Sequence, residues 1–411
     1  MNCRHESDVK HEQKQTSCHA FASISQKDLT NDTSGDSSKT CKNSVQPSKP
    51  HFVELLEHYD FFIFDCDGTL WSGKQALTGA IRFIRELRSR GKYIFFVSNN
   101  ATRMPIDTVQ KAISLGFDVV ETEVVTSGLV LSDFLIEYNR GNIIIDSSLI
   151  KQPPERIRKA LVLGEQQLVT LLNKTGIETF GSPGPDPLDQ RYSDGDYPPD
   201  DVDAVIVGYD SSLTYLRVDR AMRAIIQPKV LFLATNTDPA VPLGGKYNHP
   251  GAGITVGAVS IASETDPLIF GKPHKYMFDY LIKQILKQPS TNSSEEHSSP
   301  LSQSKTIQIN SSHVHQQLPL SQSDLSFEMS NSNQQSQKIE LPINQKQIRI
   351  EEIKKRCLMF GDRLDTDIQF GINNGMDSVL MLQGVTDAEK AEQSKIKPVY
   401  IAQNFIEILD E

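Results

Sequence analysis

The chain of 411 residues has room for two or three domains, and its 38% hydrophobic and 23% charged residues are ordinary for a globular protein. A formal net charge of -10 argues against a general nucleic-acid-binding protein, which usually presents a basic face, so we expect no nucleic-acid partner. No apolar run approaches the roughly 18 residues that a membrane span requires. The N-terminus lacks the apolar stretch of a signal peptide, and the five cysteines form no CxxC pair. We therefore predict a cytoplasmic protein with reduced thiols and no membrane association.

Two polar segments lack the apolar residues that a folded core needs. Residues 1–50 and 288–347 are rich in Ser and Gln, and each contains a single aromatic side chain, Phe21 or Phe327. Because they can bury too little surface to offset chain entropy, we predict that both are disordered. The second one is an insertion too long for an ordinary loop, either a passive spacer or a segment that docks a partner or is phosphorylated.

Strand and helix signals alternate over the rest of the chain. In chain order, strands are predicted at 61–64, 93–97, 158–163, 204–207, 230–233, 268–270, 357–360 and 378–382. Helices are predicted around Ile81, Ile84 and Leu87, from Pro105 with Ile106, Val109 and Ile113 on the inner face, and at 275–287. This alternation predicts an α/β fold with a doubly wound parallel sheet, which binds ligands at the carboxyl ends of its strands.

The folded part divides into a core and a region with strands of its own. We assign residues 51–140, 265–287 and 348–411 to the core, and residues 141–264 to the second α/β region. Under this division the strand at 268–270 belongs to the core sheet.

Four polar clusters follow predicted strands directly. They are Asp65 with Asp67, Ser98 with Asn99 and Asn100, Lys272, and Asp362 with Asp367. Side chains alternate along a strand, so the first two carboxylates lean the same way, and both stay ionised only if a cation joins them. If all four strands lie in one parallel sheet, these groups meet at one edge, and their inventory fits phosphoryl transfer.

The residues predict the following roles. Asp65 attacks phosphorus and forms an aspartyl-phosphate, and Asp67 protonates the leaving oxygen and later deprotonates the hydrolytic water. Mg²⁺, held by Asp65, the backbone carbonyl of Asp67 and Asp362, reduces the repulsion between nucleophile and substrate. The phosphoryl oxygens are expected to be bound by Lys272, the Ser98 hydroxyl and the Asn99 N–H. Asp367 is expected to orient Lys272 or a metal-bound water, although it could simply cap a helix, and Asn100 supports the site or only shapes the turn.

The stretches DCDGTLW, FFVSNNATR, FGKPHKYMF and MFGDRLDTDIQFG, in this order, resemble the haloacid dehalogenase superfamily. The second Asp of the first stretch is similar to the phosphatase branch. Trp71 and the S-N-N motif resemble the subfamily of 4-nitrophenyl phosphatases, phosphoglycolate phosphatases, pyridoxal phosphatases and NagD-type enzymes. The resemblance covers residues 53–287 and 350–411, and neither polar segment.

The resemblance implies a Rossmann-type core in which residues 141–264 form an inserted α/β cap of the C2 type. It places substrate specificity in the cap, in the segment Val207–Asp210 and in the loop that holds Thr235, Asn236 and Asp238. Relatives often dimerise through this cap, so we expect a homodimer.

The expected function is Mg²⁺-dependent hydrolysis of small-molecule phosphate esters, such as 4-nitrophenyl phosphate or phosphoglycolate. A pyridoxal phosphate phosphatase, a phosphotransferase or mutase, and a non-catalytic scaffold on the same fold are the alternatives. Cys66 alternates away from Asp65 and is expected to be a buried apolar side chain, with a redox switch as the alternative.

Overall fold

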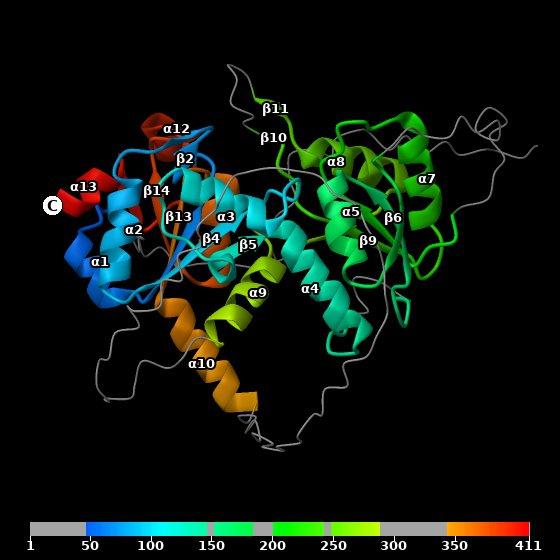
Figure 1. The fold of residues 1–411 in the computed structure, drawn as a ribbon, viewed down its shortest axis with the longest axis horizontal. Coiled ribbons are helices and arrows are strands. Elements are labelled where there is room, and N and C mark those ends of the chain that lie inside the picture. The colour runs from blue at the N-terminus through cyan, green and yellow to red at the C-terminus, as the bar shows by residue number, and fades with distance from the viewer. Residues whose placement is uncertain (1–46, 146–151, 184–199, 242–247, 288–342, 411) are drawn as a thin grey trace, which may run out of the picture. The chain divides into compact units, whose positions relative to one another are not determined.

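The computed structural model describes residues 47–145, 152–183, 200–241, 248–287 and 343–410 (Figure 1). Most of the two segments predicted to be disordered lies outside these ranges. Their inner ends were assigned wrongly. Ser48 pairs with β15 (Tyr400–Ala402), since the Ser48 N–H donates to the Val399 carbonyl at 3.1 Å, and helix α10 (Ile343–Lys355) begins before residue 347.

The core is a six-stranded sheet in the order β15-β14-β13-β1-β4-β5, and every paired strand in it is parallel. Its remaining strands are β1 (Phe61–Asp65), β4 (Tyr93–Ser98), β5 (Val124–Thr126), β13 (Cys357–Gly361) and β14 (Asp377–Met381). The central strand β1 pairs with β13 on one side and β4 on the other, so three of the predicted polar clusters follow adjacent strands.

Alternating side chains of these strands pack on the two faces of the sheet. Phe62, Phe64 and Phe360 belong to one apolar cluster, while Ile63 and Met359 belong to the other. The first face is covered by α1 (Phe52–His58), α2 (Ala80–Ser89), α3 (Pro105–Ser114) and α13 (Phe405–Asp410). The second is covered by α4 (Ser127–Asn139), α9 (Lys275–Ile285) and α11 (Gln369–Asn374). Helices on both faces of a parallel sheet confirm the doubly wound fold.

A second parallel sheet has the order β12-β9-β8-β6-β7. Its strands are β6 (Lys159–Leu163), β7 (Glu178–Gly181), β8 (Ala204–Val207), β9 (Leu231–Ala234) and β12 (Leu268–Ile269). Its helices are α5 (Gln166–Asn173), α7 (Tyr215–Ile225) and α8 (Ala252–Ser263). The assignment of β12 to the core sheet was wrong, because Leu268 and Ile269 pair with Leu233 and Ala234 of β9. A two-residue strand carries no local signal for its partner, so only the three-dimensional pairing decides its sheet.

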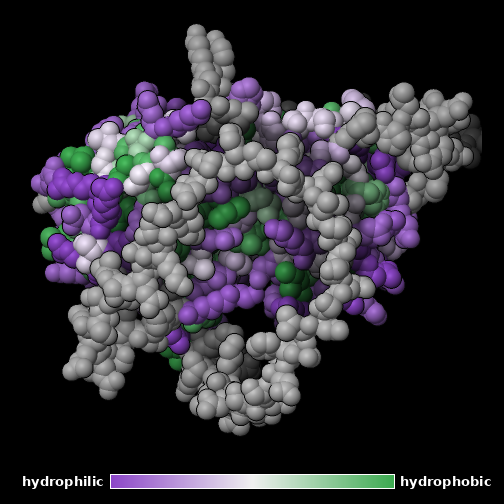
Figure 2. Space-filling view, viewed as in Figure 1, coloured by the Kyte–Doolittle hydropathy of each residue, from purple (hydrophilic) through white to green (hydrophobic). Residues whose placement is uncertain are grey.

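The smaller elements complete the described chain. They are the hairpins β2 (Trp71–Ser72) with β3 (Gln75–Ala76) and β10 (Ala240–Val241) with β11 (His249–Pro250), the short turns Glu121–Glu123 and Leu364–Ile368, and helix α12 (Ala388–Gln393). Among the described residues no helix is both long and apolar enough to cross a membrane. On the face seen in Figure 2 hydrophilic side chains predominate, with apolar ones in small groups between them.

The inner face predicted for α3 was also partly wrong. Val109 is buried, but Ile106 and Ile113 are 41% and 56% exposed. The buried stripe of α3 instead runs through Pro105, Thr108, Val109 and Ala112. Small side chains at Thr108 and Ala112 form the rest of the face that packs on the sheet, so the two isoleucines, seven residues apart, share a face that is turned away from it.

Candidate active site

The two carboxylates of the first motif lie at the carboxyl end of β1, where the chain turns at Gly68. Gly68 has φ +102°, and a Cβ on it would lie 2.4 Å from Oδ2 of Asp362. Only glycine fits both the left-handed backbone and this close approach. The turn therefore brings the loop after β1 directly against the loop after β13.

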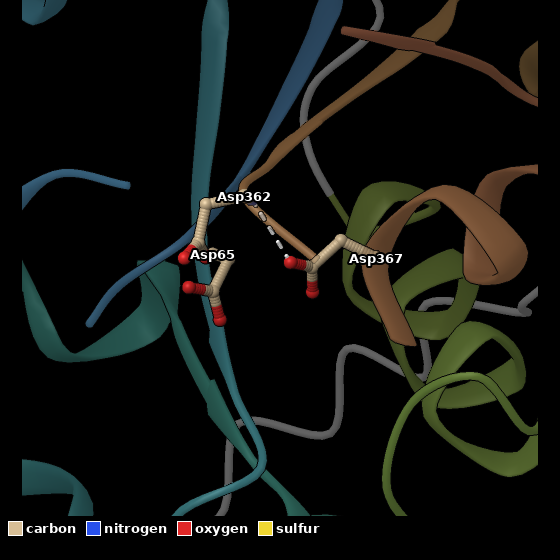
Figure 3. Close-up of side chains that lie close together, drawn as sticks. All are labelled: Asp65, Asp362 and Asp367. Atoms are coloured by element: carbon tan, nitrogen blue, oxygen red, sulfur yellow. Dashed lines mark hydrogen bonds between the residues drawn. The ribbon is translucent and has the colours of Figure 1, made fainter. Parts of the chain in front are cut away.

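Three carboxylates meet at this point (Figure 3). Ligand oxygens of Asp65, Asp362 and Asp367 lie within 4.8 Å of one another. Asp362 is fully buried and accepts hydrogen bonds from the Val385 N–H at 2.7 Å and the Thr69 hydroxyl at 3.3 Å. The Asp67 carboxylate is not in this group, which contains Asp367 instead.

Lys272 supplies the ammonium that faces the three carboxylates. Its Nζ lies 2.6 Å from Oδ1 of Asp65 and 2.8 Å from Oδ1 of Asp367, and it donates to the Val97 carbonyl at 3.2 Å. The side chain is 2% exposed, although it enters from the end of β12 in the second sheet. The convergence predicted for one sheet edge is thus reached from two sheets.

Asp367 occupies the orienting position that the sequence suggested. Its Oδ2 accepts hydrogen bonds from the backbone N–H groups of Asp362 at 3.2 Å and Arg363 at 3.1 Å, while Oδ1 faces Lys272. These donors precede the helical turn rather than follow it, so the side chain does not act as a helix N-cap.

The charges of this cluster are strongly coupled. Burial raises the pKa of Asp65 well above its ordinary value, with Lys272 opposing and Asp367 and Asp362 reinforcing the change. Burial, followed by the charge of Asp367, raises the pKa of Asp362 to about 6. The pKa of Lys272 is raised because the charges of Asp367 and Asp65 outweigh the opposing effect of burial. One ammonium therefore faces three carboxylates, of which Asp362 and Asp367 are buried.

This donor set fits a divalent cation of the Mg²⁺ type. Mg²⁺ prefers carboxylate and carbonyl oxygens, and an excess of buried negative charge attracts it. Asp65 and Asp362 present such oxygens, and the Asp67 carbonyl accepts no hydrogen bond from the residues that the structure describes. Asp65 and Asp362 therefore present carboxylate oxygens to the same point, and the backbone carbonyl of Asp67, also predicted to hold the metal, has a free oxygen atom.

The predicted phosphate-binding residues line the same cavity, but their side chains form different hydrogen bonds. Ser98 and Asn99 are each 7% exposed. The Asn99 amide binds the backbone of Lys272, accepting from its N–H at 2.7 Å and donating to its carbonyl at 3.1 Å. Asn100 holds the turn, since its Oδ1 accepts from the N–H and the hydroxyl of Thr102, both at 2.8 Å. The turn-shaping alternative for Asn100 therefore fits the structure.

The residues predicted to set specificity are only partly in the cavity. Thr235 is fully buried and does not line it, whereas Asn236 and Asp238 do. Both contact Asn99: Asn236 donates to its carbonyl at 2.7 Å, and Asp238 accepts from its amide at 2.9 Å. Burial raises the pKa of Asp238, with the Asn99 hydrogen bond opposing. The two residues thus join the loop after β9 to the loop after β4.

In the Val207–Asp210 segment, only Tyr209 lines the cavity. Asp210 is buried and forms an ion pair with Arg217 at 3.0 Å, so it stabilises the second sheet's helix packing rather than facing a ligand.

The cavity has a volume of about 170 Å³, which suits a small molecule. Its lining combines the polar groups above with Arg363, Thr366 and several apolar side chains (Ala101, Ala240, Val241, Ala252 and Val385). Among the described lining residues, Arg363 is the one cation besides Lys272. The lining therefore combines many polar groups with apolar side chains and, besides Lys272, a single guanidinium.

Sequence reasoning missed Arg363 and Lys111. The Nζ of Lys111 donates to Oδ1 of Asp67 at 2.7 Å, although the two residues lie 44 positions apart in the sequence. Because the buried face of α3 was predicted wrongly, Lys111 was not expected to point toward the site. It lies three residues after the buried Thr108 and one before the buried Ala112. Arg363 directly follows Asp362, whose carboxylate is the stronger sequence signal of a site.

Cys66 is 1% exposed and packs in the apolar cluster with Phe64 and Trp71. Burial, followed by the charges of Asp65 and Asp67, raises the pKa of its thiol well above the ordinary value. Because the thiolate is the reactive form, this environment favours the buried apolar role over a redox switch.

Comparisons with known proteins agree with this geometry. Residues 62–178 match a family model described as haloacid dehalogenase-like hydrolase, and residues 339–408 match a second hydrolase model of the same type. Chronophin of Mus musculus is 27% identical over 87% of this chain and 94% of its own length, and phosphoglycolate phosphatase 1A of Arabidopsis thaliana is 26% identical over 87% and 78%.

Solved structures share the fold. The 4-nitrophenylphosphatase from Thermotoga maritima has a TM-score of 0.58 at 23% identity, covering 87% of this chain and 98% of that one. The glycerol phosphate phosphatase from Mycobacterium tuberculosis, solved in complex with magnesium, has a TM-score of 0.56 at 21% identity and covers 87% and 78%. With the ordered motifs and the carboxylate cluster, these matches show that the chain belongs to the haloacid dehalogenase-like hydrolases, in their phosphatase branch.

Proposed function

We propose that this protein is a Mg²⁺-dependent phosphomonoesterase that hydrolyses small-molecule phosphate esters through an aspartyl-phosphate on Asp65. The observation that carries the proposal is the setting of Asp65. Its carboxylate ends β1 in a small cavity, with the Lys272 ammonium at 2.6 Å and two further buried carboxylates beside it. A nucleophile, a fixed positive charge and metal-type ligands are the parts that phosphoryl transfer needs.

The residues divide the reaction between them. The Asp65 carboxylate attacks phosphorus while the bond to the leaving oxygen breaks, and Asp67 gives that oxygen a proton. Water then attacks the aspartyl-phosphate, Asp67 takes up the water proton, and phosphate leaves. Lys272, the Ser98 hydroxyl and the Asn99 N–H would bind the phosphoryl oxygens, whose charge is spread in the transition state.

Asp65, Asp362 and the backbone carbonyl of Asp67 would hold Mg²⁺. When bound, the ion supplies positive charge that reduces the repulsion between an anionic nucleophile and an anionic ester. The magnesium complex of the mycobacterial glycerol phosphate phosphatase supports this choice of metal.

The substrates that we propose are 4-nitrophenyl phosphate and small esters of the phosphoglycolate type. Arg363 could pair with a carboxylate on the leaving group, which favours phosphoglycolate. Tyr209 could stack on a ring, which favours pyridoxal phosphate as the second candidate. The cytoplasmic location and a homodimer through the second α/β region stay predictions.

The test is a panel of metabolite phosphates assayed for free phosphate, with and without Mg²⁺. We expect release that requires Mg²⁺ and no acceptor molecule. Release that depends on a sugar acceptor would indicate a phosphotransferase or mutase instead. No turnover of any ester in Mg²⁺ would favour the non-catalytic scaffold.

A further inference from the structure

The Asp67 carboxylate, proposed above as the general acid, is held by two side chains: Trp71 of the first motif and Lys111, which lies outside the motifs. Oδ1 of Asp67 accepts from Nζ of Lys111 at 2.7 Å and from Nε1 of Trp71 at 2.9 Å. The Lys111 ammonium also lies 5.1 Å from the centre of the Trp71 ring. Lys111 comes from α3 and Trp71 from β2, so two separate elements converge on one oxygen atom.

Both donors are held firmly. Trp71 is 1% exposed, packs edge-on against Phe117 at 5.6 Å, and is tied to the turn by hydrogen bonds of its backbone with Cys66 and Gly68. The side chain of Lys111 is only 19% exposed, so its fixed position costs much of the rotamer freedom of a lysine. A partly exposed ion pair such as Lys111 with Asp67 contributes little to the free energy of unfolding. The ordering of Lys111 therefore indicates a role other than stabilising the fold.

Because both hydrogen bonds go to Oδ1, the two carboxylate oxygens of Asp67 are not equivalent. A carboxylate oxygen has about two lone-pair sites, and on Oδ1 both are taken. No hydrogen bond among the described residues involves Oδ2, and Asp67 lines the cavity. Oδ2 is therefore the oxygen free to carry a proton.

We propose that Lys111 is a positioning residue that, with Trp71, fixes Asp67 so that Oδ2 delivers the proton to the leaving group. This inference rests on the proposed phosphatase function. In the first step the Oδ2–H bond breaks as the P–O bond to the leaving group breaks, and the proton moves to the departing oxygen. In the second step Oδ2 receives a proton from the attacking water, so Asp67 returns to its starting form.

The experiment compares leaving groups. A departing 4-nitrophenolate needs little protonation, whereas a departing alkoxide needs it strongly. In Lys111→Met we expect kcat for alkyl phosphates to fall by about 10- to 100-fold, part of the usual contribution of general acid catalysis. For 4-nitrophenyl phosphate we expect a change below about threefold on the same reasoning, with KM little altered for both. The rate should thus depend more steeply on leaving-group basicity than in the wild type.

Three further variants sharpen the test. Lys111→Arg keeps a charged donor and should restore most of the alkyl phosphate rate. Trp71→Phe removes the N–H donor together with part of a buried ring, and it should steepen the leaving-group dependence in the same direction. In an Asp67→Asn background no proton can be delivered, so adding Lys111→Met should change the rate no further.

The matched control is Lys92→Met. Lys92 forms a similar, partly buried ion pair with Asp60 at 3.1 Å, just before the amino end of β1 and so away from the site. The variant Lys92→Met should leave the dependence of the rate on leaving-group basicity unchanged. An equal loss with every leaving group in Lys111→Met, or no loss, would overturn the inference while wild-type turnover stands. Absence of wild-type turnover would overturn the proposed function itself, and the inference with it.

Discussion

Replacing Lys272 by methionine removes the ammonium that contacts Asp65 and Asp367. The side chain is 2% exposed, with Nζ at 2.6 Å from Asp65 and 2.8 Å from Asp367. No other lysine or arginine of the described chain forms an ion pair with either carboxylate. Methionine has a similar length, so the substitution deletes charge with little change in volume.

The structure sets the size of the effect. Removing one partner of a buried ion pair typically costs about 3–5 kcal/mol, because the other charge stays buried without compensation. We expect a loss of this size in the free energy of unfolding of Lys272→Met. The turnover of 4-nitrophenyl phosphate should fall by about 10²–10³-fold, the usual cost of removing one group that stabilises transition-state charge.

Urea unfolding followed by circular dichroism measures the stability change. A chelator should be present, since a bound cation would stabilise the same carboxylates. The double variant Lys272→Met/Asp367→Asn should recover part of the stability, because one uncompensated charge is gone, but none of the activity. Lys283→Met is the control, because Lys283 pairs with Asp133 at 2.9 Å in a half-exposed setting and should cost at most about 1 kcal/mol. A loss for Lys272→Met as small as that of the control would refute the reasoning.

Four other changes test the remaining assignments. Asp65→Asn should abolish phosphate release and phosphoenzyme formation, and wild-type rates would remove Asp65 as the nucleophile. The pKa of Asp362 is raised to about 6 from an ordinary 3.8, so the folded protein keeps this proton at pH values where the unfolded chain has lost it. With a chelator present, the free energy of unfolding should therefore fall as pH rises from about 4 to 6. Thermal melts should show a larger stabilisation by Mg²⁺ at neutral pH than at pH 5. Equal stabilisation by Mg²⁺ at the two pH values would contradict this assignment. Asn99→Ala removes both hydrogen bonds to the Lys272 backbone and should lower kcat, whereas unchanged kinetics would mean that these bonds do not position the amine. Cys66→Ser should leave the response to peroxide unchanged, because the thiol is buried with a raised pKa, and a change in sensitivity would revive the redox switch.

The parts of the site that lie at the ends of the central strands could be predicted from sequence. Asp65, Ser98 and Asp362 each follow an apolar run long enough to be a buried strand, and parallel strands end at one edge. The i, i+2 spacing of Asp65 and Asp67 also placed Cys66 on the opposite side, in the apolar cluster. These inferences depend only on local periodicity and on the handedness of strand connections.

The partner of a strand could not be predicted in the same way. Leu268 and Ile269 read as a strand, but their hydrogen bonds go to β9 rather than to the core sheet. The choice depends on backbone positions that a local pattern does not encode. Lys111 was missed for a related reason, since a one-residue error in the buried stripe of α3 rotates every side chain by about 100° around the helix axis.

Asn99 explains how a lysine from the second sheet can meet an aspartate of the first with such short contacts. Its side chain pairs with the N–H and carbonyl of Lys272, and its own carbonyl accepts from Ser127 and Asn236, each at 2.7 Å. One core residue therefore fixes the backbone on which the ammonium depends, and the same residue holds the loop after β9 through Asn236 and Asp238. A displacement of that loop cannot leave Asn99 unaffected, so it reaches Lys272 through two hydrogen bonds. The alignment of the amine with the nucleophile is for this reason tied to a loop whose residues Asn236 and Asp238 line the cavity.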